Sequence, residues 1–265
     1  MLGTLLRQPN DRQIRNVESA MEIPVTFSII TPTFNCVEKL YTTVDSVLSQ
    51  TYKFFEYIII DGNSTDGTVN FVRSIHNEHI KFQSEPDQGI YDAMNKGIKL
   101  ATGRYLLFLG AGDRIYPDIL EKIAQLLPAD DESLVYGNVS WNDKIYDGEF
   151  NRLKLAHKNI CHQAIFYGNK VFDLVGAYET KYRMWEDWHF NMKCFKNSKV
   201  LIKYIDTVVS YYEDGGLSST GDPLFEDHKL FLIRKNLGWY VYCRYRCPEI
   251  KYRLSQFIRS IIRRR

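Results

Sequence analysis

The sequence predicts an α/β protein with a mostly parallel central sheet, and three observations lead to this prediction. The run Tyr105–Leu109 holds only bulky apolar and aromatic residues, which is typical of a strand buried on both faces of a parallel sheet. Strand-like and helix-like segments alternate over residues 25–127, which favours right-handed crossovers. Two strand-like runs end at a carboxylate, Asp61 and Asp113, and open α/β sheets bind ligands at the carboxyl ends of their strands.

The first half of the chain supplies the parallel strands, expected at residues 25–31, 58–60, 80–84 and 105–109. Pro32 is expected to end the first strand because proline has no N–H for a sheet ladder. Apolar residues recur at helical spacing in the intervening segments, which predicts helices at 40–48, 69–75, 90–98 and 117–127. Asp87 is expected to cap the third helix, and Pro117 to occupy the first turn of the fourth.

The regular alternation of strands and helices ends after residue 127. Strands are expected at 134–141, 144–150 and 200–211, with short helices around Val171 and Asp187 between them. These elements indicate a mixed region. Residues 222–265 are predicted to be mostly helical and become increasingly basic, and residues 1–24 are predicted to form a polar arm.

The composition is that of a globular protein, with 45% hydrophobic and 25% charged residues over 265 positions. The five cysteines contain no Cys-x-x-Cys pair, which favours reduced thiols in the cytosol over a disulfide frame or a zinc site. No signal peptide and no apolar stretch of transmembrane length are recognised. A dinucleotide fingerprint at Gly110 is rejected because Ile115 stands where its third glycine belongs.

Asp113 closes the buried run as Gly-Ala-Gly-Asp and is the first candidate for a functional residue. Mg²⁺ and Mn²⁺ prefer oxygen ligands, commonly one or two carboxylates together with substrate phosphates. We therefore expect Asp113 to hold a divalent ion that holds a diphosphate. The alternative is a solvated turn carboxylate, which is common after Gly.

Five segments occur in a fixed order: Thr31–Asn35, Asp61–Thr68, Glu85–Gly97, Phe108–Asp113 and Trp185–Trp188. Together they resemble the family 2 glycosyltransferases, inverting enzymes with the GT-A fold, and the likeness covers roughly residues 25–215. The third and fifth segments look most like bacterial enzymes that build O-antigen, capsule or exopolysaccharide. The resemblance divides the chain into a GT-A domain at 25–221, with a nucleotide-sugar half (25–127) and an acceptor half (128–221), and a C-terminal region at 222–265.

The resemblance also implies roles for individual positions. Asp187 corresponds to the base that activates the acceptor, with Glu186 beside it, and Asp113 to the last carboxylate of the metal motif. Gly110 and Gly112 stand where the family commonly has further metal ligands, and Gly62 stands where it has a second Asp. The implied donor-binding residues are Thr31, Pro32, Phe34, Asn35, Asp61, Asp87, Asn95 and Lys96. The implied acceptor side or pocket rim consists of His162, Gln163 and Trp185.

The expected function is inverting transfer of a sugar from a nucleoside diphosphate, most simply a UDP-sugar, to a saccharide or a polyprenyl-diphosphate-linked acceptor, with Mg²⁺ or Mn²⁺. The sparse Gly-Ala-Gly-Asp motif keeps open a catalytically silent protein that binds a nucleotide-sugar or a partner. Nucleic-acid binding is disfavoured because the basic residues gather in one tail and no such motif is present.

That tail, Arg244–Arg265, holds eight Lys or Arg residues against one acid, Glu249. Its apolar residues recur at helical spacing: Ile250, Leu254, Phe257, Ile258 and Ile261. A basic amphipathic helix of this kind lies in the interface of an anionic membrane. We therefore expect a cytoplasmic protein held at the inner face of the cell membrane. Packing of the tail on the catalytic domain, or on a second subunit in a homodimer, is the alternative.

Overall fold

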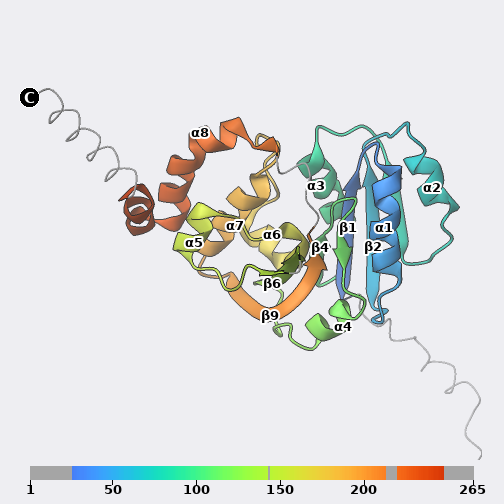
Figure 1. Ribbon diagram of the computed structural model, residues 1–265, viewed down its shortest axis with the longest axis horizontal. Coiled ribbons are helices and arrows are strands. Elements are labelled where there is room, and N and C mark those ends of the chain that lie inside the picture. The colour runs from blue at the N-terminus through green and yellow to red at the C-terminus, as the bar shows by residue number, and fades with distance from the viewer. Residues whose placement is uncertain (1–25, 143, 213–219, 248–265) are drawn as a thin grey trace, which may run out of the picture.

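The computed structural model describes residues 26–142, 144–212 and 220–247, and the predicted N-terminal arm and basic tail lie almost wholly outside them. Nine strands in these ranges form one sheet (Figure 1). They are β1 Phe27–Thr33, β2 Phe55–Asp61, β3 Ile80–Ser84, β4 Tyr105–Phe108, β5 Arg114–Ile115, β6 Ser133–Trp141, β7 Lys144–Tyr146, β8 Ile165–Gly168 and β9 Leu201–Tyr211. Their order is β3-β2-β1-β4-β8-β6-β9-β5, with β7 paired to β6.

The predicted sheet is confirmed in its parallel half and in its mixed half. β1 pairs in parallel with β2 and β4, and β2 with β3. β8 then runs antiparallel between β4 and β6, and β9 returns in parallel on β6. The sequence did not predict β8, because its four apolar residues can equally be a helix segment.

Helices cover both faces of this sheet (Figure 1). They are α1 Val37–Leu48, α2 Thr68–Ser74, α3 Ile90–Leu100, α4 Ile119–Ala124, α5 Arg152–His157, α6 Asn169–Val175, α7 Glu186–Lys196 and α8 Pro223–Leu232. A 3₁₀ turn, η1 His162–Ala164, precedes β8, and a π-helical turn, η3 Ile233–Leu237, follows α8. Residues 239–247 are also helical.

Two hydrophobic cores lie on opposite faces because side chains alternate along each strand. Ile29 belongs to the core under α1, whereas Ile30 belongs to the core that α3, α7 and α8 share. Gly97 lets α3 approach closely, since a Cβ there would lie only 2.5 Å from Ile30 Cγ2.

Three local predictions are wrong. β1 continues through Pro32 to Thr33. Pro32 lacks an N–H on the side of β4, and this does no harm because the pairing with β4 has already ended at Ile30. Gly89, not Asp87, is the N-cap of α3. Pro117 precedes α4, which starts only at Ile119.

The C-terminal helices belong to the folded body. Phe225, Leu232, Ile233 and Leu237 are almost fully buried in the same core as residues of α7. No helix within the described ranges is long and apolar enough to cross a membrane.

Candidate active site

The carboxyl ends of β1, β2 and β4 share one edge of the sheet, and the predicted donor-binding residues begin there. Thr31 and Pro32 are buried inside β1, where the Thr31 hydroxyl shares a 3.0 Å hydrogen bond with Tyr57 Oη. Phe34, just past the strand, is 60% exposed. Of these three, only Phe34 therefore offers a large exposed surface.

Asp61 ends β2 and is completely buried. Its Oδ2 accepts hydrogen bonds from Ser64 N (2.9 Å) and Ser84 Oγ (2.7 Å), and its Oδ1 accepts one from Ser64 Oγ. Both oxygens are therefore used within the chain to fix the loop after β2.

Asn35 and Asp66 hold the other side of that loop. Asn35 has a left-handed backbone (φ 47°), and its Oδ1 accepts from Thr65 N at 2.8 Å. Asp66 accepts from Val37 N, at the start of α1, and from Thr68 N, at the start of α2. We call Asn35, Asp61, Ser64 and Asp66 the Asp61 network.

Asp87 explains why glycine stands at position 62. A Cβ on Gly62 would lie 2.6 Å from Asp87 Oδ2 and 3.2 Å from the Phe34 ring. Asp87 Oδ1 accepts from Gly89 N at 2.9 Å, which keeps the carboxylate against Gly62. The structure thus brings Phe34 and Asp87 together.

Asn95 and Lys96 make their hydrogen bonds elsewhere. The Asn95 amide bonds to the Tyr178 main chain twice, donating to its carbonyl and accepting from its N–H. Lys96 Nζ lies 2.9 Å from Glu85 and 3.5 Å from Asp92. Both side chains therefore brace neighbouring segments, and the donor contacts that the resemblance implies for them stay predictions.

Asp113 and His162 meet because β8 is antiparallel to β4. Asp113 follows the end of β4, and His162 precedes the start of β8, so both lie at the same edge. Gly110 N donates to Asp113 Oδ2 at 2.8 Å within a turn that needs Gly112 at φ 108°. His162 Nε2 lies 3.3 Å from the same oxygen, at an ion-pair distance.

The pair fits a divalent ion by the chemistry of its donors. His162 Nε2 is buried and makes no well-aligned hydrogen bond among the described residues. Asp113 adds a carboxylate whose side chain is 18% exposed. An imidazole nitrogen and a carboxylate oxygen are ligands that Mn²⁺ accepts.

The pKa of His162 depends on two carboxylates. Desolvation alone would lower the pKa of His162, but Asp113 and Asp187 outweigh it and raise the pKa above its usual value. The ring is therefore near enough to both acids, Asp113 after β4 and Asp187 in α7, for each to favour its protonated form.

Asp187 is the second residue of α7 and is 9% exposed. Tyr91 Oη donates to its Oδ1 at 2.9 Å, and Asn159 Nδ2 donates to its Oδ2 at 2.7 Å. Burial raises the pKa of this carboxyl, and His162 and the two hydrogen bonds offset part of the rise. We call Asp113, His162, Asp187, Tyr91 and Asn159 the His162 cluster.

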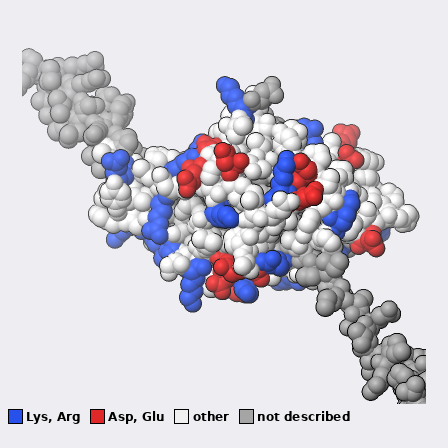
Figure 2. All heavy atoms as spheres, turned by 90° about the horizontal axis from the view of Figure 1, so that it is seen from below, with Lys and Arg blue, Asp and Glu red and all other residues white. Residues whose placement is uncertain are grey.

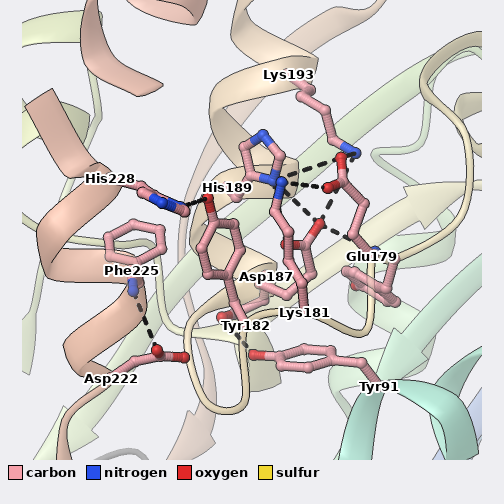
Figure 3. Close-up of polar contacts among 12 residues, drawn as sticks. Tyr91, Glu179, Lys181, Tyr182, Asp187, His189, Lys193, Asp222, Phe225 and His228 are labelled. Carbon is pink, nitrogen blue, oxygen red and sulfur yellow. Dashed lines mark hydrogen bonds and ion pairs between the residues drawn. The ribbon is translucent and has the colours of Figure 1, made fainter. Parts of the chain in front are cut away.

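Glu186 belongs to a separate charged group with Glu179, His189 and Lys193, and these three partners are labelled in Figure 3. It is fully buried, accepts from Glu179 N at 3.1 Å, and lies 3.1 Å from His189 Nδ1. Burial raises the pKa of Glu186, and His189 opposes the rise.

Glu179, Glu186 and His189 lie close enough together to share an ion. However, Lys193 Nζ stands 3.6 Å from Glu179 and 3.8 Å from Glu186, and Lys181 pairs with Glu179 at 2.7 Å. These ammonium groups already balance the carboxylates, so the group supports the start of α7 rather than a metal.

The two remaining rim residues differ. Trp185 packs edge-on against Trp188 and Phe225, with ring centroids 5.8 and 5.6 Å away. Gln163 is 1% exposed, and its Oε1 has no hydrogen-bond partner within the described part of the chain. An unsatisfied buried oxygen beside His162 is a polar group left available to a ligand.

Sequence reasoning missed Tyr91, Asn159, Glu179 and His189. Tyr91 lies inside the quoted segment Glu85–Gly97, and His189 follows Glu186 by three residues, a spacing that places both on one helix face. Nothing in the sequence pointed to Asn159 or Glu179.

Comparison with known proteins agrees with this architecture. Residues 28–197 match the model of glycosyl transferase family 2. The chain belongs to this family. A "PGL/p-HBAD biosynthesis glycosyltransferase" of Mycobacterium bovis is 43% identical over 203 residues, which cover 73% of this chain and 79% of the relative. An uncharacterized glycosyltransferase of Mycobacterium tuberculosis is 34% identical over 63% of this chain and 68% of its own.

Solved structures share the fold at lower identity. TarS 1–349 of S. aureus in complex with UDP-GlcNAc superposes with a TM-score of 0.63 at 20% identity, over 80% of this chain and 71% of that chain. The mannosyltransferase PcManGT of Pyrobaculum calidifontis, solved with GDP-Man and Mn²⁺, gives 0.58 at 18% identity, over 73% and 58%. The GT-A fold expected from the sequence is therefore confirmed.

Proposed function

We propose that this glycosyltransferase moves a sugar from a nucleoside diphosphate, a UDP-sugar in the first instance, to a hydroxyl of a saccharide or lipid-linked saccharide, with inversion. The observation that best supports the proposal is that one imidazole, His162, lies 3.3 Å from Asp113 and is also within electrostatic reach of Asp187. An inverting transfer needs a base on one side of the sugar and a place for the leaving diphosphate on the other.

Asp187 has the properties of the base. Its carboxylate is held by Tyr91 and Asn159, and its raised pKa makes it a stronger proton acceptor than an exposed Asp. Glu186, turned toward His189, holds the first turn of α7 and so keeps Asp187 in place.

Asp113 and His162 suit the diphosphate side. They would hold a divalent ion there, and the bound ion would neutralise charge that builds on the departing diphosphate. Without the ion, a protonated His162 would itself attract that charge, which its raised pKa favours. The Mn²⁺ in the PcManGT structure supports such an ion, although Gly110 and Gly112 leave fewer protein ligands here.

Phe34 and Asp87 are proposed to contact the nucleotide, because they adjoin each other at the end of β1 and Phe34 is exposed. The UDP-GlcNAc in the TarS structure supports a UDP-sugar, and the name of the M. bovis relative supports a role in biosynthesis rather than in degradation. A lipid-linked acceptor would be reached at the cytoplasmic face of the membrane.

A donor screen tests the proposal. UDP-, GDP- and dTDP-sugars are incubated with the protein and with Mg²⁺ or Mn²⁺, and nucleotide release is measured with and without saccharide acceptors. We expect metal-dependent release of UDP that rises with acceptor, and a product of inverted anomeric configuration by NMR. Donor binding by calorimetry without any turnover would instead identify a silent nucleotide-sugar-binding protein.

A further inference from the structure

Large aromatic side chains are exposed together at the C-terminal end of the described chain. Phe231 of α8 is 63% exposed, and Trp239 and Tyr240, in the helix that follows η3, are 62% and 73% exposed. The other large exposed apolar residues of the described chain lie between 36% and 70% exposed. Aromatic rings gathered in water at one place mark a binding surface.

Basic side chains accompany these rings. Arg234 Cζ lies 5.3 Å from the Trp239 ring centre, and Lys235 Nζ lies 5.7 Å from that of Phe231. Residues 228–247 contain five Lys or Arg and no Asp or Glu. In Figure 2 the outermost end of the molecule, beside the grey C-terminal trace, shows blue atoms and no red ones.

The opposite side of the same helices is fixed to the catalytic region. Leu232, Ile233, Leu237 and Val241 are at most 6% exposed and share a core with Trp188 of α7. The exposed rings therefore sit on helices that pack in one core with α7, the helix that contains Asp187.

We propose that this aromatic–basic surface, made of Phe231, Arg234, Lys235, Trp239, Tyr240 and Arg244, docks on an anionic lipid membrane. Trp and Tyr have an apolar body and a polar tip and favour the headgroup level of a bilayer. Lys and Arg beside them match the negative surface of phospholipids. A second copy fits less well, because a two-fold interface would set this cationic surface against itself.

Membrane docking rests on the proposed function, because it places the enzyme where a lipid-linked acceptor lies. Binding to vesicles can nevertheless be measured without any sugar transfer. Flotation of the full-length protein is compared on phosphatidylglycerol–phosphatidylcholine vesicles and on phosphatidylcholine alone, at low salt. We expect flotation with the anionic vesicles. Arg234→Gln/Lys235→Gln/Arg244→Gln should lower the partition coefficient on the order of a hundredfold, at about fivefold per basic residue.

Trp239→Ser/Tyr240→Ser should lower partitioning by roughly tenfold or more, because it removes apolar area from the interface. The matched controls remove exposed side chains elsewhere: Tyr41→Ser/Phe54→Ser for the rings, and Lys99→Gln/Lys144→Gln/Lys199→Gln for the charges. Circular dichroism of each variant confirms that it is folded. Both sets of surface variants should keep nucleotide release with a soluble acceptor, so a failed transfer reaction is distinguished from failed docking.

Three results would overturn the proposal. The surface variants could float as well as the controls, in which case the basic tail beyond residue 247 suffices. The wild-type protein could remain unbound to anionic vesicles. Light scattering could show a dimer that Trp239→Ser/Tyr240→Ser dissociates, which would make the surface a subunit interface.

Discussion

The Asp61 network and the His162 cluster lie at the same edge of the sheet, but they differ in how far hydrogen bonds offset the burial of their polar groups. Both oxygens of Asp61 and both oxygens of Asp66 accept hydrogen bonds from neighbouring residues. In the His162 cluster, both oxygens of Asp187 also accept hydrogen bonds, yet burial raises its pKa, and the buried Nε2 of His162 lacks a well-aligned hydrogen bond within the described chain.

The difference separates carboxylates that fold the protein from carboxylates that are available for chemistry. The carboxylates of the Asp61 network accept from main-chain N–H and hydroxyl groups of the loop that they stabilise. A buried, incompletely compensated group costs stability, and proteins retain such groups mainly at functional sites. Mutations in the two groups should therefore separate loss of stability from loss of turnover.

The largest expected effect is at Asp113. Asp113→Ala removes the carboxylate proposed to hold the metal, so transfer should fall to background, and EDTA should do the same to the wild-type protein. Initial rates at saturating donor measure this, with Asp173→Ala on the exposed surface of α6 as the control. Full activity of Asp113→Ala in EDTA would contradict the metal role.

Asp187→Asn keeps the shape of the side chain but removes the base. We expect kcat to fall on the order of 10²–10⁴, with donor affinity nearly unchanged. The midpoint of urea unfolding should change little, because a neutral amide carries less desolvation cost than a buried carboxylate. Loss of donor affinity with retained kcat would show that Asp187 binds the donor instead.

Asp61→Ala should show the reverse pattern. It leaves the half-buried donors of Ser64 and Ser84 without their acceptor, which costs roughly 2–4 kcal/mol of stability. Urea denaturation measures the loss, and Asp173→Ala again serves as the control. A rise in donor KM at unchanged kcat would add the donor contact that the family resemblance implies, whereas unchanged stability would refute the structural role.

Tyr91→Phe should have the smallest effect and refines the comparison. The Tyr91 hydrogen bond favours the charged form of Asp187 and lowers its pKa. Its loss should raise that pKa, so the acidic limb of the kcat–pH profile should move to higher pH, with a change of only a few fold at the optimum. A shift to lower pH would contradict this sign.

Much of the parallel half of the fold could be predicted because its signals are local. β3 was predicted with its exact bounds, and the apolar runs of β2 and β4 stand between turn residues. Errors arose where a tertiary contact decides. Pro32 remains in a strand only because β4 has ended beside it, and β8 gains its identity from β4 and β6 on either side.

The candidate site residues that could be predicted are those that lie in short sequence motifs. Asp113, His162 and Asp187 were identified from short segments, and the structure brings them together. Asn159 holds Asp187 from a loop after α5, a neighbour that only the fold creates. Asn95 illustrates the converse, since its position in a motif suggested a ligand contact while its amide is bound to Tyr178.

Asp222 gives the C-terminal helices a practical importance for protein engineering. Its Oδ1 accepts from Phe225 N and starts α8, while its Oδ2 accepts from Met184 N, three residues before Asp187. One carboxylate thus ties two segments that are separated by β9. A chimera joined upstream of residue 222 would need to recreate this bond. A junction after Leu237 would instead transfer the Met184 segment, Asp222 and α8 together as one unit.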